Sequence, residues 1–572
     1  MFDKIFKRGK RLVTGPQNSV LSAATIIMFM VVASRVLGLV RQRVLAHFFT
    51  PESLSLFFAA FRLPDLVFEV LVFGTFSSAF IPVFTKALNK SKKEAWDIAG
   101  RVVNIGLLIF IVFAFCFSFF SEPFYTILAP GYSVEDTRKI ASIAKILFAA
   151  QGFFVVSYVL TGVLESLRRF LISALAPVFY NLGIILGTLI FSPFLGLPGP
   201  GYGVFLGALL HFSVQLPFAY KLGFRFSRNI KPTQGVIQIA RLAIPRVIDL
   251  SFQQIAKTVE LFFASIISTA SYTYFTFANT LQLLPVGIFG VSLAKASLPT
   301  LSAQSEDYKA FRKTLFTTLY QIVFLVLPLS TTLIVLRIPI VRLVFGTGIF
   351  DWQSTVQTGL VLTAFAVGIV FQSASALLAR GFYALHDTKT PVAISIGAVL
   401  ITIASDIILV GGFSLPVWAL AASFSLGAIF QALLLFFFLV KRIDHTLPLD
   451  SIIPMIKSFI AALASGIVMF FFLKLFDRSV WVKRLSFLQG VDPETALSFN
   501  RFVLDTRYTV NLFILTSLVA LVGFFVYLMF SYFLKSQELA SFVSLLKRRK
   551  IGAPPTKEAE PLSLPTSESV NT

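Results

Sequence analysis

Long apolar runs separated by short polar connections make up most of the chain. A helix needs about 20 mostly apolar residues to cross the hydrocarbon core of a bilayer. The pattern therefore predicts an all-α membrane protein with fourteen spanning helices. The first run is too long, and its end too basic, for a cleaved signal peptide. The expected spans are roughly 20–46, 54–84, 97–120, 139–163, 173–196, 202–220, 236–268, 272–300, 314–336, 355–380, 391–412, 415–440, 452–475 and 508–534.

The composition excludes the main classes of soluble protein. Hydrophobic residues make up 56% of the 572 residues and charged residues only 13%, whereas soluble domains are about 45–50% apolar and about 25% charged. The single cysteine, Cys116, rules out a disulfide framework and a cysteine metal site, and four scattered histidines argue against any other metal centre. The chain contains no G-x-x-x-x-G-K-[ST] phosphate loop. We therefore expect no ATP hydrolysis, no metal and no cofactor.

Lys and Arg residues alternate between successive connections, and in membrane proteins they mark the cytoplasmic side. This alternation predicts that both termini are cytoplasmic, which agrees with an even number of spans. It also explains the net charge of +22 without a nucleic-acid partner. The main exception is the expected external loop 476–507, which carries five basic residues. The basic clusters lie at 4–11, 86–93, 168–169, 221–231, 309–313, 441–442 and 547–550.

Two weak similarities at nearly equal separation indicate an internal repeat. Residues 79–82 match 296–299 at an offset of 217, and 174–178 match 388–392 at an offset of 214. Parallel repeats of six spans are common in secondary transporters, where the substrate binds between the halves; chance similarity between apolar helices is the alternative. The expected organisation is a basic N-terminal tail (1–19), two six-helix bundles (20–220 and 236–440), two added helices (452–534) and a cytoplasmic tail (535–572) that is disordered after about 551.

The first span carries arginines inside the membrane, where charged residues are costly and usually face a cavity or the protein interior. Arg35 and Arg41 lie about 120° apart on a helix, so they can flank one wedge of a cavity. Ser34 and Gly38 belong to the same stretch and are further candidate substrate-binding residues. Because no acid on this span balances the two arginines, we expect them to bind an anion.

Spans 2 and 7 each carry a polar stripe at helical spacing. An alternative to a functional role stays open for both: Arg62 with Asp65, and Lys257 with Glu260, are spaced to neutralise each other and hold helices together. We take Arg62 and Lys257 as candidate substrate-binding residues and the four acids as candidate coupling or gating residues. The stripes consist of Arg62, Asp65 and Glu69 on span 2, and of Arg246, Asp249, Gln253, Lys257 and Glu260 on span 7.

The charges in these spans, counted together with Arg43, leave a surplus of about two cations, mostly arginine. A guanidinium group binds a diphosphate through two parallel hydrogen bonds, whereas an ammonium acts only as a point charge. The surplus therefore favours an amphiphilic anion with a diphosphate head group. A cation antiporter is disfavoured, since it would need a surplus of acid. The acids of the loop 476–507 follow no recognisable catalytic pattern, so we expect no catalytic residues.

The first two spans together resemble the MurJ (MviN) family, the lipid II flippases of bacterial peptidoglycan synthesis within the MOP exporter superfamily. The resemblance extends over about 20–535. It implies two six-helix bundles in a V around a cationic cavity, a groove at the two added helices for the polyprenyl tail, and contacts of Arg35 and Arg41 with the diphosphate-sugar head group. The matching stretches are Ser34–Arg41, Phe57–Asp65, Gly74–Pro82, and, further along, Gly381–Pro391.

The chain departs from the family pattern at several charged positions. The family's acids become Ser55, Gln42 and Phe73, and its basic residues become Phe68 and Thr280. We hypothesise that Lys257, which reflection about the connection places level with Thr280, replaces the cation missing from span 8.

The sequence thus predicts a divergent lipid II flippase of the bacterial cytoplasmic membrane that works by alternating access in cell-wall biosynthesis. Its expected partners are lipid II or a related polyprenyl-diphosphate glycolipid, the surrounding membrane lipids and cell-wall synthesis enzymes. Two alternatives stay open. One is an exporter of another polyprenyl-diphosphate-linked glycan, which the lost family charges favour. The other is a scaffold relative that does not transport.

Overall fold

Helices form nearly all of the computed structural model in the residues that it describes, 20–70, 79–227, 229–443, 452–477 and 504–540. The membrane imposes this, because the bilayer core offers no water to pair with backbone N–H and C=O groups, and a helix pairs them internally. Apart from helices, the described part contains one isolated β-bridge, between Asp477 and Leu504. The all-α prediction is confirmed.

In the described part, the first half consists of five long helices and four short ones, α3, α4, α5 and α7. Their bounds are α2 (Val20–Phe48), α3 (Pro51–Ala60), α4 (Arg62–Phe68), α5 (Ile81–Lys90), α6 (Lys92–Phe119), α7 (Ser121–Leu128), α8 (Val134–Ser166), α9 (Phe170–Leu195) and α10 (Pro198–Leu222).

The second half repeats this plan and adds two helices at its end. Its elements are α11 (Gln234–Ile267), α12 (Ser271–Pro285), η3 (Val286–Val291), α13 (Ser292–Ala303), α14 (Tyr308–Val335), α15 (Arg337–Phe345), α16 (Trp352–Ala384), α17 (Lys389–Asp406), η4 (Ile407–Gly412) and α18 (Trp418–Ile443), followed by α19 (Ile453–Phe476) and α21 (Thr509–Phe533).

Eleven membrane-spanning segments in the described part are long and apolar enough to cross a bilayer. Helices also occupy the other three predicted spans, 20–46, 54–84 and 236–268, although residues 71–78 lie outside the description. The count of fourteen and the cytoplasmic placement of the termini stay predictions. The predicted tail 1–19, most of the loop 476–507 and residues 541–572 also lie outside the described residues.

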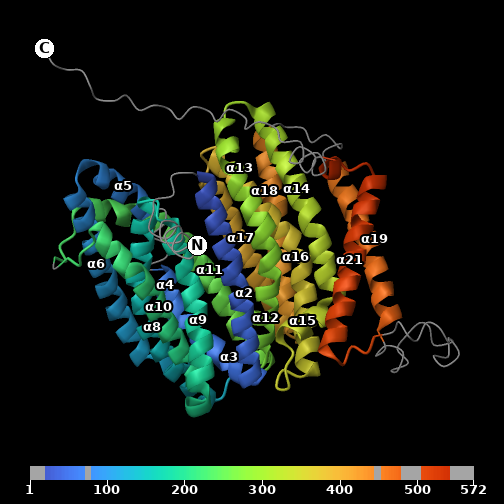
Figure 1. The fold of residues 1–572 in the computed structure, drawn as a ribbon, viewed down its shortest axis with the longest axis horizontal. Coiled ribbons are helices and arrows are strands. Elements are labelled where there is room, and N and C mark those ends of the chain that lie inside the picture. Colours follow the sequence, from blue (N-terminus) through green and yellow to red (C-terminus); the bar gives the residue numbers. More distant parts are fainter. Residues whose placement is uncertain (1–19, 71–78, 228, 444–451, 478–503, 541–572) are drawn as a thin grey trace, which may run out of the picture.

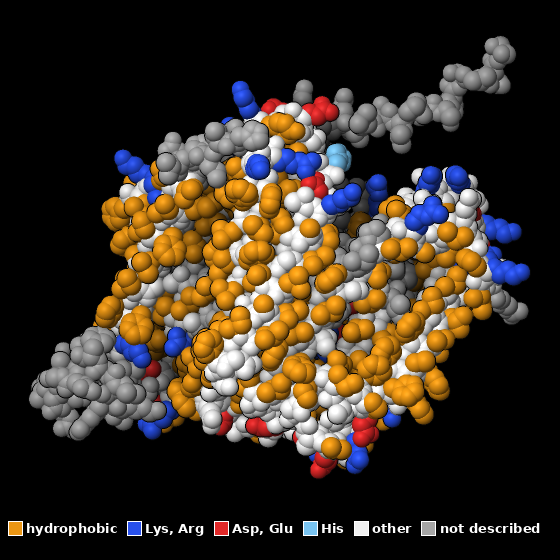
Figure 2. Space-filling model, turned by 180° about the vertical axis from the view of Figure 1, so that it is seen from behind, with side chains coloured by type: hydrophobic (Ala, Val, Ile, Leu, Met, Phe, Trp, Pro, Cys, Tyr) orange, Lys and Arg blue, Asp and Glu red, His pale blue; other side chains and the backbone are white. Residues whose placement is uncertain are grey.

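The helices pack as two groups that diverge from a common end, with α2 to α10 on one side and α12 to α18 on the other (Figure 1). The long helix α11 contacts both groups, and α19 and α21 pack on each other and on α14. Hydrophobic side chains cover the middle of the molecule, and Lys and Arg side chains gather along its upper end (Figure 2). This distribution fits a membrane belt with a basic cytoplasmic face. The predicted domain boundaries stay predictions.

Spans 2 and 8 deviate from α-helical geometry at corresponding places. The π-helical turn η3 begins at Val286, and span 2 becomes π-helical at Glu69–Val70. The 217-residue offset between the two repeats places the start of η3 at position 69. The coincidence supports the internal repeat, because π-turns are rare in helices and concentrate at functional sites.

Helices α9 and α10 approach each other most closely, through two glycines on each. A Cβ on Gly183 would lie 2.3 Å from the Cα of Gly207, and a Cβ on Gly187 would lie 2.1 Å from the Cα of Gly203. Both helices thus carry a G-x-x-x-G pattern, the arrangement that lets membrane helices pack backbone against backbone. This contact makes the hairpin of spans 5 and 6 a rigid unit.

Substitution of Gly187 by Val should destabilise the protein by about 1–3 kcal/mol, because the new side chain overlaps the backbone of α10. The measurement is the apparent melting temperature of the purified protein in detergent. Gly348→Ala is the control, since nothing lies within 4 Å of a Cβ at that position. Equal melting temperatures for the two variants would contradict the close packing of α9 against α10.

The N-terminal start of α17 is held by Asp387. Its carboxylate accepts hydrogen bonds from the Lys389 and Thr390 backbone N–H groups at 3.1 and 3.0 Å, and it forms an ion pair with Arg442 at the end of α18. Partial burial raises the pKa of Asp387, but the hydrogen bonds from Thr390 and the charge of Arg442 outweigh it, so the pKa lies below the usual range. One side chain thus caps α17 and links it to α18.

Asp387→Asn should lower the melting temperature at neutral pH, since it removes the ion pair and weakens a cap worth about 1 kcal/mol. Because the pKa is depressed in the folded state, the ionised group stabilises the protein above the pKa of an unfolded Asp, about 3.9. The difference from wild type should therefore stay constant from pH 8 to about pH 5 and shrink only below about pH 4.

The matched control is Asp307→Asn, because Asp307 caps α14 in the same way, through the N–H groups of Lys309 and Ala310 at 3.1 Å, and forms no ion pair in the described structure. If both variants lost the same stability, the Arg442 contact would contribute nothing.

Candidate functional site

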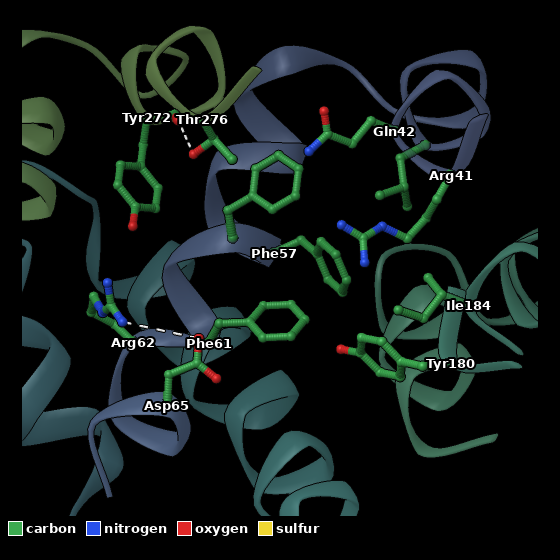
Figure 3. Close-up of a pocket in the computed structure, with 12 residues that line it drawn as sticks. Arg41, Gln42, Phe57, Phe61, Arg62, Asp65, Tyr180, Ile184, Tyr272 and Thr276 are labelled. Atoms are coloured by element: carbon green, nitrogen blue, oxygen red, sulfur yellow. Dashed lines mark hydrogen bonds and ion pairs between the residues drawn. The ribbon is translucent and has the colours of Figure 1, made fainter. Parts of the chain in front are cut away.

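A cavity of about 290 Å³ lies between spans 1, 2, 5 and 8, where the two halves meet. Aromatic rings form much of its wall, and two arginines and one acid supply its charge. Figure 3 shows these side chains converging from α2, α3, α4, α9 and α12. The lining residues are Arg41, Gln42, Leu45, Phe57, Phe58, Phe61, Arg62, Asp65, Tyr180, Ile184, Tyr272 and Thr276.

Arg41 projects from α2 into this cavity, toward Tyr180 and Ile184 of α9 (Figure 3). In the described part of the chain no carboxylate forms an ion pair with it, and no acceptor takes a hydrogen bond from its guanidinium group. An arginine in a membrane cavity is costly unless it meets an anion or water. Arg41 is therefore the cation of this cavity that is free to bind a ligand.

Arg62 lines the same cavity but is already partly neutralised. It is 6% exposed, lies 4.0 Å from Asp65, and donates a hydrogen bond of 3.0 Å to the Gln254 side chain on α11. Asp65 in turn accepts a hydrogen bond of 2.9 Å from Gln151 on α8. The pair of Arg62 with Asp65, left open as an alternative for span 2, is therefore formed, and the network joins α4, α8 and α11.

Lys257 forms its ion pair with Glu69 of span 2, at 3.4 Å, and not with Glu260 one turn further along α11. The i, i+3 pair that was left open as an alternative for span 7 is therefore not formed, because the lysine side chain reaches across to the neighbouring helix. Glu260 is 8% exposed, and Arg62 and Lys257 lie near enough to act on its charge.

Arg35 does not line this cavity. Its guanidinium group donates a hydrogen bond of 3.1 Å to the backbone carbonyl of Leu283 on α12 and packs against Gly287 in the π-turn η3. The structure thus places Arg35 at the seam between the two halves, where any side chain on Gly287 would collide with it. The prediction that both span-1 arginines contact one ligand is not tested by this arrangement.

Ser34 and Gly38 lie where α2 packs on α9. The side-chain amide of Asn181 donates to the carbonyl and hydroxyl oxygens of Ser34 at 3.3 and 3.2 Å, and a Cβ on Gly38 would lie 3.9 Å from the Asn181 side chain. They shape the helix contact beside the cavity. The side chains of Arg246 and Asp249 lie outside the described part, so their predicted roles stay predictions.

Several hydrogen bonds between the halves lie near the C-terminal end of α2. Arg43 donates to the carbonyls of Leu343 and Val344, the last turn of α15, at 2.6 and 3.1 Å. A cation at a helix C-terminus is favourable because the free carbonyls carry partial negative charge. Further along the same seam, Gln42 donates to Thr280 at 2.8 Å. These contacts join the two halves beside the cavity, and they give Arg43 a specific role in that contact.

The sequence analysis missed the aromatic residues of the wall and one acid elsewhere in the second half. Tyr180 and Tyr272 are ordinary aromatic residues in apolar runs, and nothing in their spacing marks them. Asp406 is different, because it is the only ionisable residue between Lys389 and Lys441. An isolated acid inside a predicted span was a sufficient signal.

A family model described as the lipid II flippase MurJ matches residues 44–491 of this chain. The chain belongs to the MurJ family. A probable lipid II flippase MurJ of Vibrio cholerae is 31% identical over 425 residues, covering 71% of this chain and 80% of the relative. A lipid II flippase MurJ of Burkholderia cenocepacia is 28% identical over 436 residues, covering 72% of this chain and 81% of the relative.

Solved structures agree with the MurJ assignment. A structure of the lipid II flippase MurJ in an inward closed conformation is 25% identical and matches with a TM-score of 0.71, covering 92% of this chain and 100% of that one. A multidrug MATE transporter of the MOP superfamily, in its inward-facing conformation, matches with a TM-score of 0.59 at 16% identity, over 72% of this chain and 94% of that one. The second match concerns the fold alone. As a multi-pass MurJ protein, the chain resides in the bacterial inner membrane.

Proposed function

We propose that this protein flips lipid II from the inner to the outer leaflet of the bacterial cytoplasmic membrane by alternating access. The observation that carries the proposal is the free guanidinium group of Arg41 in an aromatic-walled cavity of a MurJ-family protein. The diphosphate binds Arg41, and the sugar rings pack against Phe57, Phe61 and Tyr180. Arg35 joins the site once the two halves move apart at α12.

The polyprenyl tail stays in an apolar environment while the head group crosses. A groove of about 580 Å³ between α15 and α21 suits such a tail, since its walls are almost entirely apolar. It is lined by Ile340, Leu343, Val344, Thr509, Val510 and Phe513. Helix α21, the second of the two added helices, thereby gives the lipid an apolar contact along the second half of the protein.

Driving energy comes from the membrane potential or an ion gradient. Each elementary charge that moves through the potential contributes about 2.3 kcal/mol per 100 mV. Asp65, Glu69, Asp249 and Glu260 are the candidate coupling or gating residues in this proposal. Cell-wall synthesis enzymes are the proposed partners that use the flipped lipid.

Arg41→Ala should weaken binding of lipid II to the purified protein roughly 10- to 150-fold, because a charge-assisted hydrogen-bonding partner contributes about 1.5–3 kcal/mol. Arg41→Lys should recover only part of the affinity, since an ammonium cannot bind the diphosphate through two parallel bonds. Arg138→Ala is the control, an arginine exposed at the surface in an ion pair with Glu122.

Competition with a polyprenyl diphosphate that carries an unrelated glycan separates the alternatives. A preference for lipid II that Arg41→Ala abolishes supports the flippase. Equal binding of both lipids in wild type would instead identify a broader exporter of lipid-linked glycans. Absence of binding would leave the scaffold alternative.

Glu69→Gln should raise the affinity for lipid II several-fold, because it releases Lys257 from its ion pair and increases the positive charge beside the cavity. Lys257→Met should lower the affinity for lipid II in the wild-type background. In the Glu69→Gln background the same substitution should lower it by a larger factor, because Lys257 is no longer neutralised there. Unchanged affinity in both Lys257 variants would refute the hypothesis that Lys257 replaces the cation missing from span 8.

A further inference from the structure

A second polar pocket, of about 300 Å³, lies where α15 and the starts of α16 and α21 meet the end of α2. Its two cations come from different halves, since Arg43 belongs to α2 and Arg342 to α15. In the described structure it shares no lining residue with the cavity around Arg41. The alternation of basic residues along the chain predicts that this end of the molecule faces the outside. We call this site the Arg342 pocket.

Neither arginine of the Arg342 pocket is neutralised by an acid. In the described part of the chain, no carboxylate forms an ion pair with Arg43 or Arg342. Asp351 lines the same pocket, but its carboxylate caps α16 by accepting a hydrogen bond of 2.8 Å from the Ser354 N–H. Two like charges that line one pocket repel each other, and an anion bound between them removes the repulsion.

The Arg342 side chain is held in place without using most of its donors. Its guanidinium group lies over the Trp352 ring, 5.7 Å from the ring centre, and donates a long hydrogen bond of 3.5 Å to the Arg507 carbonyl. A guanidinium group has five N–H donors, so several are left for a ligand. Trp352 is 53% exposed, and tryptophan is enriched at the membrane–water interface. The pocket thus has the composition expected at the depth of lipid phosphates.

The apolar groove between α15 and α21 adjoins the Arg342 pocket. Thr509, the first residue of α21, lines both, and the groove continues from it along Val510 and Phe513. These two side chains are 68% and 61% exposed, so a lipid chain can enter the groove from the side. A cationic pocket joined to an apolar groove is complementary to an amphiphile with a phosphate head and a long apolar chain.

We propose that the Arg342 pocket binds the diphosphate of the flipped lipid once its head group has reached the outside, while the polyprenyl chain stays in the groove. A diphosphate fits better than the phosphodiester of a phospholipid, because it carries more negative charge and has enough oxygens to bind both guanidinium groups. The inference rests on the lipid path proposed above and adds a second, outward binding site to it.

The position of the two arginines gives this site a further property. Arg43 and Arg342 line one pocket only while α2 and α15 are in contact. A diphosphate bound between them therefore favours the state in which the halves are closed at this end. The flipped lipid thus stabilises the return of the protein to the state that accepts the next head group.

The test uses the full-length protein in phosphatidylcholine nanodiscs and a farnesyl diphosphate that carries a photoreactive diazirine on its chain. Mass spectrometry quantifies the label on residues 509–513 of α21. At subsaturating probe, Arg342→Gln should lower this labelling roughly tenfold, because it removes a charge-assisted contact. Arg342→Lys should recover part of it, since an ammonium keeps the charge but cannot bind bidentately. The corresponding alcohol probe, which lacks the diphosphate, should label wild type as weakly as the diphosphate probe labels Arg342→Gln.

Arg138→Gln is the matched control, because it removes an exposed arginine at the same predicted side of the membrane, and it should label like wild type. The alcohol probe tests the same contact in the wild-type protein, so the result does not depend on the folding of a variant. Labelling that is independent of both Arg342 and the diphosphate would overturn the proposal, since the groove would then bind any apolar chain. Loss of labelling when phosphatidylglycerol replaces phosphatidylcholine would also overturn it and identify a phospholipid site.

Because the probe carries no sugar and its label is read on α21, the outcome is independent of the lipid II binding assay for Arg41. Arg342-dependent labelling together with unchanged lipid II binding in Arg41→Ala would refute the proposed inner site and leave the outer one in place. The converse result would refute the outer site and leave the proposed flippase.

Discussion

A charge inside a bilayer needs a counter-charge, a hydrogen-bond partner or water, and this requirement organises the interior of the protein. Hydrophobic side chains face the lipid, and the polar stripes of spans 2 and 7 turn toward each other. Arg62 is paired with Asp65 and Lys257 with Glu69. Among the described residues Arg41 is left in the cavity without such a partner, and the proposal of an anion site rests on this.

Much of the fold was predictable because each membrane-spanning helix requires a long apolar run, and short polar connections separate these runs. Apolar runs gave the spans, and the weak repeat agrees with the π-helical geometry shared by spans 2 and 8. The candidate site was harder, because it depends on how each helix is rotated and on which neighbour it meets. Arg35 and Arg41 lie on one helix, yet one reaches the seam at Leu283 and the other the cavity.

Side-chain reach explains the remaining differences. Local spacing favoured a pair between Lys257 and Glu260, but a lysine side chain is long enough to meet Glu69 on another helix. The aromatic wall could not be predicted, since Tyr180 and Tyr272 resemble dozens of other aromatic residues in apolar runs. Asp406 could have been noticed from the sequence, but its lack of partners is known only from the packing of α17 against α18 and α11.

The protein combines rigid and adaptable parts in a way that suits alternation. The interlocked glycines of α9 and α10 fix one hairpin, while spans 2 and 8 carry π-turns beside the seam. A π-turn accommodates one additional residue in a helix, so the side chains beyond it are rotated by about 100° relative to an uninterrupted α-helix. Its occurrence at corresponding positions of the two halves has a geometric consequence: on both sides of the contact between the halves, the two ends of one span present different faces to their neighbours.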